Sequence, residues 1–382
     1  MDIRDLTPDD LGAVLEVRKR SFGPISASDT ETWYQLVTPS VEQQRYLGVF
    51  DGDRLMAAAR YRRLTQWWHG RPQPLAGVAG VVVGPEDRGR GVGRTITRAV
   101  MRRAVEHGYA LSALYPATTA IYRSVGYEHV GAQHIVTLPT EALRSLAPAG
   151  TVKLRRMGPG DAPEVIATLG RIHAATRASG PISWEERTWR QWLGEEDDFL
   201  YLADDGFAVY RWDDGAIELD TLVAVSEETT RALWSLVGSA STVAKSVTAC
   251  VAPDDPILWL LRERTKEQVK QVRWMLRVHD LPLAMERRGF SAAVELDAVV
   301  RVEDAEEPGA GGTWRLTVSG GAGRAEPAQG EGPRLSANGL AALYGGLPAG
   351  LLRRTGMLRG DDRYDEALES AFAASPYMLD YF

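Results

Sequence analysis

The chain of 382 residues has a single cysteine, Cys250, and this scarcity excludes two kinds of structure. One thiol forms neither an intrachain disulfide nor a cysteine-based metal site. The histidines do not supply a metal site either, because their spacing is not that of metal ligands. They stand at His69, His107, His129, His134, His173 and His279. We therefore expect no bound metal.

Long apolar runs and an excess of positive charge are also missing. No apolar stretch approaches the roughly 20 residues that a membrane-spanning helix needs. The acidic start, MDIRDLTPDD, lacks the apolar region of a signal peptide. The net charge is −7, so there is no basic excess to meet the phosphates of nucleic acid. These absences predict a cytoplasmic protein that binds neither membranes nor nucleic acid.

The most informative segment that is present runs through residues 78–93, VAGVVVGPEDRGRGVG. An apolar, β-branched run ends at Gly84, and a glycine-rich segment then leads into a helical pattern. Glycines let the backbone approach a ligand closely, and the free amides at a helix start face an anion. Arg88 and Arg90 add positive charge. The segment predicts a strand, a glycine loop and a helix around a phosphate-bearing ligand.

The pattern of the first 148 residues indicates one compact α/β domain. Thr7 and Pro8 precede the first helical pattern, as a cap residue and a first-turn proline do. An Asp-Gly turn at residues 51–53 predicts a hairpin between residues 46–50 and 54–61. The further expected elements are a helix over 92–107, a strand over 109–115, a short helix near 121–122 and a strand over 129–138.

The same order of elements recurs after residues 146–150, which have the composition of a linker. Asp-Gly turns at 204–206 and 213–215 separate expected strands, and a strong strand follows over 216–225. It leads into SEETTRAL, which has no glycine and no arginine pair before the helix. We therefore expect a second, structural copy of the first domain that binds no nucleotide-like ligand.

The pattern changes again from about residue 290. Residues 294–302 and 313–318 are strand-like, and two stretches rich in Gly, Ala, Pro and Glu are expected to be exposed loops, over 303–312 and 320–333. Helical patterns return over 339–344 and 364–372. The chain ends in YMLDYF, an aromatic end where frayed, polar termini are common.

Two motifs and the whole-chain plan carry a resemblance to a known family. R-G-R-G-V-G at residues 88–93 matches the R-x-x-G-x-G/A signature with which Gcn5-related N-acetyltransferases (GNATs) grip the pyrophosphate of acetyl-CoA. IYRSVGY at residues 121–127 resembles their I-Y-x-x-x-G-Y element. Residues 274–290 resemble the junction into the last domain of one branch, the Eis ("enhanced intracellular survival") family, which acetylates amines of aminoglycosides.

The resemblance implies an α+β (α/β) architecture of three domains. Two tandem GNAT-like domains would occupy residues 1–148 and 149–288, the second without the CoA loop. A sterol-carrier-protein-like α/β domain would occupy residues 289–382. The family also forms hexamers, so the resemblance implies a homo-oligomer, with a hexamer as the expected assembly.

The resemblance further implies the roles of individual residues. Tyr122 would be the general acid, and the terminal carboxylate of Phe382 would be the general base. Acetyl-CoA would be the cosubstrate and a small-molecule amine the acceptor. The residues matched to cosubstrate binding are Val81, Val82, Val83, Arg88, Gly89, Arg90, Gly91, Val92, Gly93, Arg94, Ala117 and Thr118.

A polycationic acceptor requires carboxylates and aromatic walls in its pocket. Asp29 and Trp33 follow the first helix, where this fold shapes the acceptor site, and Asp380 and Tyr381 adjoin the terminal residue; Glu31 and Tyr34 are further candidates. The penultimate residue is Tyr381 rather than an acid, and few acids flank it in the sequence. The sequence therefore supports acetyl transfer more strongly than an aminoglycoside acceptor.

Simpler readings of the same residues stay open. Tyr122 could be a core tyrosine, Arg88 and Arg90 solvated loop charges, and Trp33 ordinary packing. Two other functions also stay open: acetylation of another amine, such as a protein lysine or a biosynthetic intermediate, and a non-catalytic regulator that binds CoA or a lipid. The intact glycine loop and Tyr122 favour catalysis over the regulator.

Overall fold

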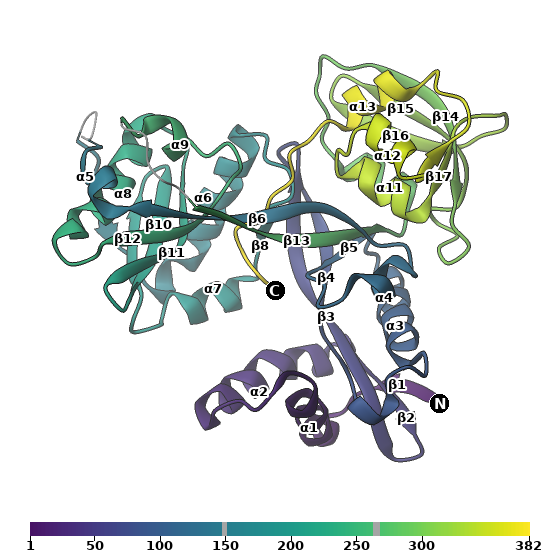
Figure 1. The fold of residues 1–382 in the computed structure, drawn as a ribbon, viewed down its shortest axis with the longest axis horizontal. Coiled ribbons are helices and arrows are strands. Elements are labelled where there is room, and N and C mark those ends of the chain that lie inside the picture. The colour runs from purple at the N-terminus through teal and green to yellow at the C-terminus, as the bar shows by residue number, and fades with distance from the viewer. Residues whose placement is uncertain (147–150, 263–267) are drawn as a thin grey trace.

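The computed structural model describes residues 1–146, 151–262 and 268–382 (Figure 1). Three parts follow one another along the chain: a first part over residues 1–146, a second part over 151–278 and a C-terminal part over 281–382. Most of the expected linker at 146–150 lies outside the described residues. None of the described helices is both long enough and apolar enough to cross a bilayer.

The first part contains the predicted hairpin, glycine loop and helix. β2 and β3 meet at the Asp-Gly turn, with Asp51 opposite Arg54. One long helix, α2, was not predicted from the periodicity. The elements are β1 (Asp2–Asp5), α1 (Leu11–Phe22), α2 (Ala27–Glu42), β2 (Tyr46–Asp51), β3 (Arg54–Trp68), β4 (Arg71–Val83), α3 (Val92–Glu106), β5 (Leu111–Leu114), α4 (Thr119–Arg123), β6 (Glu128–Pro139) and α5 (Thr140–Arg144).

The second part repeats this order. Both predicted Asp-Gly turns join strands, β9 to β10 and β10 to β11. A short strand, β8, precedes the helix α7. The elements are β7 (Arg155–Arg156), α6 (Ala162–Ala175), β8 (Ile182–Ser183), α7 (Glu186–Trp192), β9 (Phe199–Ala203), β10 (Gly206–Asp213), β11 (Ala216–Ala224), α8 (Glu227–Gly238), β12 (Ser246–Val251), α9 (Ile257–Leu260) and β13 (Gln268–Val278).

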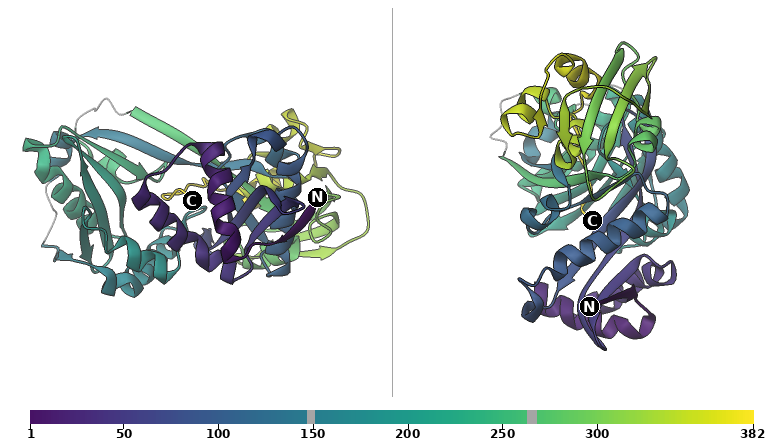
Figure 2. Two further views of the ribbon diagram at one scale, coloured as in Figure 1. Left: turned by 90° about the horizontal axis from the view of Figure 1, so that it is seen from below. Right: turned by 90° about the vertical axis from the view of Figure 1, so that its right-hand side faces the viewer.

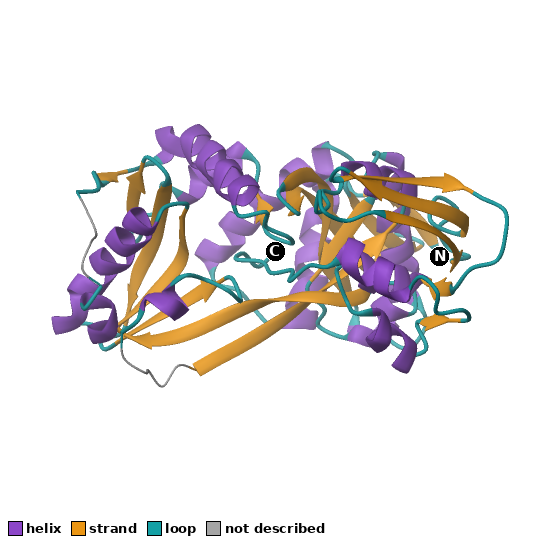
Figure 3. Cartoon of the chain, turned by 90° about the horizontal axis from the view of Figure 1, so that it is seen from above, coloured by secondary structure: helices purple, strands orange, loops and turns teal. Residues whose placement is uncertain are grey.

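The strands of these two parts form one continuous sheet. The order is β1-β2-β3-β4-β5-β13-β6-β12-β11-β10-β9-β7, with β8 paired to β3 off this path. β13 thus inserts between β5 and β6, and β6 pairs with β12 on its other edge. Figure 3 shows the long strands β6 and β13 crossing from one half of the molecule to the other. Each part therefore completes the sheet of its neighbour.

The C-terminal part has a separate five-stranded sheet in the order β16-β15-β14-β17-β18, with helices packed against it. Its elements are α10 (Leu281–Arg287), β14 (Leu296–Glu303), β15 (Gly312–Ser319), β16 (Ala322–Pro327), β17 (Arg334–Ser336), α11 (Ala337–Tyr344), α12 (Ala349–Arg354), β18 (Leu358–Arg359) and α13 (Asp365–Phe372).

The prediction of an exposed loop over residues 320–333 was wrong, because this stretch contains β16. The inward positions of β16 are Gly323 and Ala325, so the strand carries no large apolar side chain. The Phe290 ring fills the space beside Gly323, where a Cβ atom would lie 2.3 Å from it. The alternation of buried and exposed residues is real, but glycine and alanine conceal it in the sequence.

The last ten residues, 373–382, leave α13 and run between the first two parts; we call them the tail. Figure 2 shows the chain end lying between these parts rather than on the outer surface. The glycines Gly131 and Gly180 make room for the passage. A Cβ atom on Gly131 would lie 2.4 Å from the Pro376 carbonyl oxygen, and one on Gly180 would lie 2.5 Å from that of Tyr377.

Candidate active site

The site begins where two parallel strands separate. β4 and β5 pair only through Ala76 with Ser112 and Gly77 with Ala113. Beyond Gly77, the remaining residues of β4 pair with β3 alone among the described strands. A bulge at Gly80, with φ +62°, accompanies the divergence. The strand edge over residues 78–83, which includes Val81, Val82 and Val83, therefore offers free backbone groups to a ligand.

A glycine loop follows β4 and leads into α3. Gly89 and Gly91 have φ of +76° and +78°, a conformation that costs an L-residue energy. A Cβ atom on either would meet nothing within 4 Å, so the backbone conformation rather than crowding requires glycine. The first amides of α3, beginning at Val92, Gly93 and Arg94, have no partner within the helix. The arrangement suits an anion at the helix start.

The arginines of this loop differ in their partners. Arg90 pairs with the buried Asp87 at 2.9 Å, and Asp87 also accepts two hydrogen bonds from Arg54, at 2.7 and 3.0 Å. Arg94 donates to the Ser124 carbonyl oxygen at 3.0 Å, which ties α3 to α4. The exposed Arg88 has no ion-pair partner within 4 Å among the described residues. Neither Arg88 nor Arg94 has a carboxylate partner among the described residues, so both charges are left for an anionic ligand.

Tyr122 lies on the short helix α4. Its side chain is buried, and its ring stands edge-on to that of Tyr127, with centroids 6.1 Å apart. Burial raises the pKa of Tyr122 to about 12, and the Tyr381 hydroxyl acts in the same direction. The phenol is therefore protonated near neutral pH and can donate its proton. Ala117 and Thr118 are exposed just before α4.

The tail is fixed along its length by hydrogen bonds to both parts. The Tyr377 amide donates to Ser179, and the Gln133 amide donates to the Leu379 carbonyl oxygen, at 3.1 and 3.0 Å. The Tyr115 hydroxyl donates to the Asp380 carbonyl oxygen at 2.9 Å. These contacts determine where the chain ends.

Aromatic contacts fix the last two residues. The Tyr381 ring stacks on Tyr115 with centroids 4.3 Å apart. The Phe382 ring is buried against Tyr115, and a Cβ atom on Gly77 would lie 2.9 Å from it. Gly77 is the last residue of β4 that pairs with β5, so the chain end lies where the strands begin to separate.

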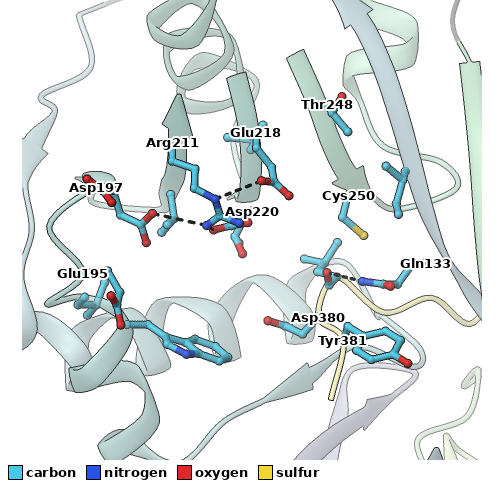
Figure 4. Close-up of a pocket in the computed structure, with 18 of the residues that line it drawn as sticks. Gln133, Glu195, Asp197, Arg211, Glu218, Asp220, Thr248, Cys250, Asp380 and Tyr381 are labelled. Carbon is cyan, nitrogen blue, oxygen red and sulfur yellow. Dashed lines mark hydrogen bonds and ion pairs between the residues drawn. The ribbon is translucent and has the colours of Figure 1, made fainter. Parts of the chain in front are cut away.

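A cavity of about 610 Å³ opens beside the tail (Figure 4). Its carboxylates come from the second part and from the tail: Glu195, Asp197, Asp198, Glu218, Asp220 and Asp380. Trp189, Trp192 and Tyr381 supply aromatic surface. The cation among its lining residues is Arg211, which pairs with Glu218 at 3.1 Å and Asp220 at 2.6 Å. The excess of negative charge suits a cationic ligand.

Comparison with known proteins identifies this arrangement. Profiles described as "Acetyltransferase (GNAT) domain" match residues 2–130 and 180–278, and a "Sterol carrier protein domain" profile matches 281–379. A GCN5-related N-acetyltransferase from Kribbella flavida is 44% identical, with a TM-score of 0.97 over 100% of this chain and 98% of that one. The chain belongs to the GCN5-related N-acetyltransferase family.

Two further comparisons support an Eis-like acetyltransferase. N-acetyltransferase Eis of Mycobacterium tuberculosis is 27% identical over 96% of this chain and 96% of its own length. Eis1 from Mycobacterium abscessus is 21% identical and shares the fold, with a TM-score of 0.78 and full coverage of both chains. The expected architecture, two GNAT domains followed by a sterol-carrier-like domain, is confirmed. The protein is an acetyl-CoA-dependent N-acetyltransferase.

In the acetyltransferase, a buried chain of hydrogen bonds supports the segment that carries Tyr122. Tyr127 and Ser112 share a hydrogen bond of 2.6 Å, and Ser112 bonds His279 Nε2 at 2.7 Å. His279 Nδ1 then bonds Glu307 of the C-terminal part at 2.9 Å. Burial lowers the pKa of His279. The sequence contains each of these residues but no local signal that joins them.

The C-terminal part also contacts this segment directly. The Asn338 side-chain amide donates to the carbonyl oxygens of Arg123 and Tyr127, at 3.1 and 2.7 Å. Arg277 and Asp304 form a fully buried ion pair of 2.6 Å beside Gly126. The C-terminal part of the acetyltransferase thus supplies the tail and also contacts residues 123–127, which directly follow Tyr122 in the chain.

Two carboxylates of the cavity, those of Asp220 and Asp380, have a raised pKa. Burial raises the pKa of Asp220 to about 6; Arg211 opposes this shift, and the charge of Asp198 adds to it. Burial likewise raises the pKa of Asp380 to about 6, and the nearby Trp184 side chain opposes this shift. Both carboxylates are ionised at pH 7 and lose charge as the pH falls through 6.

The predicted acceptor residues fall into two groups. Asp380 and Tyr381 line the cavity of the acetyltransferase, whereas Asp29 and Trp33 lie on α2 and are not among its lining residues. Asp29 is exposed in the first turn of α2, and Trp33 packs edge-on against Tyr34. The acids of the second part were missed, although Glu218 and Asp220 alternate on one strand and thus share a face.

No group of three or more His, Cys, Asp or Glu side chains within the described ranges is arranged to hold a metal ion.

Proposed function

We propose that the acetyltransferase transfers the acetyl group of acetyl-CoA to a primary amine of an aminoglycoside-type acceptor. The observation that carries the proposal is the acidic cavity beside the tail, with six carboxylates and one arginine among its lining residues. Its volume of about 610 Å³ suits a small molecule of several rings. Ammonium groups of such an acceptor would meet carboxylates and the faces of tryptophan and tyrosine rings.

The three parts would then divide the work. Residues 1–148 would bind acetyl-CoA and carry Tyr122, residues 149–288 would shape the acceptor cavity, and residues 289–382 would deliver the terminal carboxylate. The pyrophosphate would lie at Gly89–Gly91 and the start of α3, with Arg88 and the adjacent residues around it. The pantetheine arm would follow the free edge of Val81, Val82 and Val83, and Ala117 and Thr118 would flank it.

The chemistry requires two protons to leave the ammonium nitrogen and one proton to reach the sulfur. An alkyl ammonium has a pKa near 10.4, so a base must favour the neutral amine. The Phe382 carboxylate would accept the first of these protons, directly or through water. The amine nitrogen then bonds the acetyl carbon while the carbon–sulfur bond breaks, and Tyr122 donates its proton to the departing thiolate. The second proton lost by the nitrogen would pass through water to the Tyr122 phenolate and restore the phenol. A backbone amide near Val82 or Val83 would stabilise the carbonyl oxygen as it gains charge.

Release of the CoA thiol, measured with aminoglycosides, lysine peptides and simple amines, tests this proposal. We expect Asp220→Asn with Glu218→Gln to raise KM for an aminoglycoside about tenfold or more. Asp297→Asn, which removes an exposed carboxylate of the C-terminal part, is the matched control and should leave KM unchanged. Equal rates with lysine peptides would contradict the aminoglycoside acceptor, and no thiol release with any amine would contradict catalysis.

We further propose that the enzyme is a cytoplasmic homo-oligomer, with a hexamer as the expected assembly. Metabolism supplies acetyl-CoA in the cytoplasm, which supports that location. Light scattering coupled to size-exclusion chromatography measures the mass directly. A mass equal to one chain of 41.9 kDa at micromolar concentration would contradict the assembly.

A further inference from the structure

A second, smaller cavity lies between β3, α2 and α7. Its volume is about 70 Å³, and five arginines line it: Arg45, Arg60, Arg62, Arg63 and Arg187. Glu185 is the one carboxylate among its described lining residues, and it pairs with Arg63 at 3.4 Å. We call this cavity the arginine pocket.

The buried arginines of this pocket lack counter-ions. No carboxylate lies within 4 Å of Arg45, Arg60 or Arg62 in the part of the chain that the structure describes. Arg45 and Arg60 are only 4% and 7% exposed. Arg60 hydrogen-bonds only the Leu36 carbonyl oxygen and the Ser40 hydroxyl, both at 3.2 Å. Arg45 donates hydrogen bonds to the Gln43 side-chain oxygen and to the Tyr61 carbonyl oxygen, at 2.8 and 2.9 Å. A buried charge without a counter-ion is costly, so the pocket favours an anion at Arg60 and Arg62.

Arg62 is the least satisfied of the three. Its buried Nε has no hydrogen-bond partner among the described residues, and its guanidinium lies over the Trp184 ring at 5.0 Å. Burial lowers the pKa of Arg62 to about 9, and the charge of Arg60 lowers it further. The guanidinium groups of Arg60 and Arg62 therefore repel each other, and a bound negative group would reduce this repulsion.

The arginine pocket adjoins the end of the tail. Arg62 pairs with Gly77 across β3 and β4, and paired residues of antiparallel strands point to the same face of the sheet. The Phe382 ring covers Gly77 on the face where its Cβ would stand. Trp184 lies next to both the arginine pocket and the end of the tail, since the Arg62 guanidinium lies over its ring and the ring centroids of Trp184 and Phe382 are 6.5 Å apart. An anion in the pocket would thus be a neighbour of the proposed reaction centre.

We propose that the arginine pocket binds a carboxylate or phosphate group of the acceptor, through Arg60 and Arg62. The preferred acceptor would then be an aminoglycoside-type amine that also bears one carboxylate or phosphate group, with its cations at the acidic cavity and its anion here. The volume of about 70 Å³ fits one such group, since a water molecule takes about 30 Å³ of liquid volume. Guanidinium groups bind these oxygens in pairs. The statement about the acceptor rests on the proposed function, whereas anion binding does not.

The first test measures anion binding by the full chain saturated with CoA, so that the glycine loop is already filled. Inorganic phosphate and acetate are titrated separately, and tryptophan fluorescence reports through Trp184. We expect saturable binding that Arg62→Gln or Arg60→Gln weakens about tenfold or more, and that Arg62→Lys partly retains. Arg315→Gln, at an exposed arginine of the C-terminal part, should change nothing.

The two titrations distinguish a phosphate site from a carboxylate site, because the anion that binds more tightly identifies the kind of group that the pocket takes. Saturable binding of neither anion would overturn the proposal, and so would equal affinity in the wild type and the two glutamine variants. Circular dichroism verifies that each variant is folded.

The second test compares an amine that carries a carboxylate with its methyl ester as acceptors. We expect Arg62→Gln to raise KM for the acid over KM for the ester by about tenfold. An unchanged ratio would overturn the statement about the acceptor. If no amine is acetylated, the proposed function fails, and the anion titration still decides whether the pocket is a binding site.

Discussion

The two GNAT copies of this chain share a fold but differ at the point where a strand meets a helix. In the first copy, β4 leads through Gly89 and Gly91 into α3, whose first amides are free for a ligand. In the second copy, β11 leads directly into α8, whose start is closed by its own side chains. Ser226 caps the helix by accepting from the Thr229 amide at 3.2 Å. The same architecture therefore binds an anion only where the loop leaves the helix start open.

The second copy also carries the opposite charge at this junction. Glu227 and Glu228 stand in the first turn of α8, where they favour the helix and repel a phosphate. Asp205 accepts from the Ser226 amide at 3.0 Å, which satisfies the same end of the helix. The sheet of this copy instead directs Glu218 and Asp220 into the acidic cavity. The same fold thus leaves a helix start open in one copy and presents carboxylates to a cavity in the other.

The largest effect is expected at the place where the two copies meet, which is the tail. Adding residues after Phe382, or deleting it, should abolish acetyl transfer, by at least about 100-fold, because the carboxylate moves from its fixed position. Thiol release measures the loss, and CoA affinity should stay unchanged. An equal extension at the exposed Met1 is the matched control. Full activity in the extended tail would contradict the role of the terminal carboxylate.

The next effect concerns Tyr122, which belongs to the first copy alone. Tyr122→Phe keeps the buried ring and removes the proton, so kcat should fall about 10²-fold or more, with KM for the acceptor unchanged. Tyr115→Phe is the control for losing a nearby hydroxyl that only positions the tail, and should reduce kcat less. Equal losses in the two variants would contradict a proton-donating role specific to Tyr122.

The contrast between the loops predicts a smaller effect on cosubstrate affinity. Gly91→Ala places a Cβ on a residue with φ +78°, at a cost of roughly 1–2 kcal/mol, so the Kd for CoA should rise about tenfold. Gly215→Ala imposes the same strain in the second copy, where Gly215 has φ +77°. Calorimetry should detect weaker CoA binding in the first variant only. Equal weakening in both would show that the loop has no special role.

The acidic cavity of the second copy predicts a pH dependence. Asp220 and Asp380 both have a pKa of about 6, so each is mostly ionised at pH 7 and mostly protonated at pH 5. KM for a cationic acceptor should rise severalfold as the pH falls from 7 to 5, because the cavity loses negative charge. Asp220→Asn should flatten the profile. A KM that stays constant between pH 7 and pH 5 would contradict the role of these carboxylates.

How much of this could be predicted from the sequence differs between the copies for a physical reason. The Asp-Gly turn before Arg54 and the loop at Gly89 are local, so their residues specify them. The insertion of β13 is not local, since Leu276 pairs with Glu128, nearly 150 residues earlier. Neither strand carries a signal that names its partner, because strand preference depends on what packs against it.

The candidate site follows the same division. The glycine loop and Tyr122 each sit in one short motif, and the resemblance found them. The acidic cavity and the arginine pocket draw on strands and helices that are distant in the sequence. Asp220 on β11 and Asp380 in the tail become neighbours only after the strands of the first two parts join into one sheet and the tail passes Gly131 and Gly180. The amino-acid composition counts these charged residues, but it does not show that they lie close together in the fold.

The smallest effect isolates the helix cap of the second copy. Ser226→Ala removes the side chain that accepts from the Thr229 amide, which should lower the free energy of unfolding by about 1 kcal/mol. Denaturant unfolding measures this loss, and the Kd for CoA should not change, since α8 binds no cosubstrate. Ser239→Ala, at the other end of α8, is the control and should cost less. A weaker CoA affinity in Ser226→Ala would mean that the second copy still takes part in cosubstrate binding, and the contrast between the two helix starts would then be wrong.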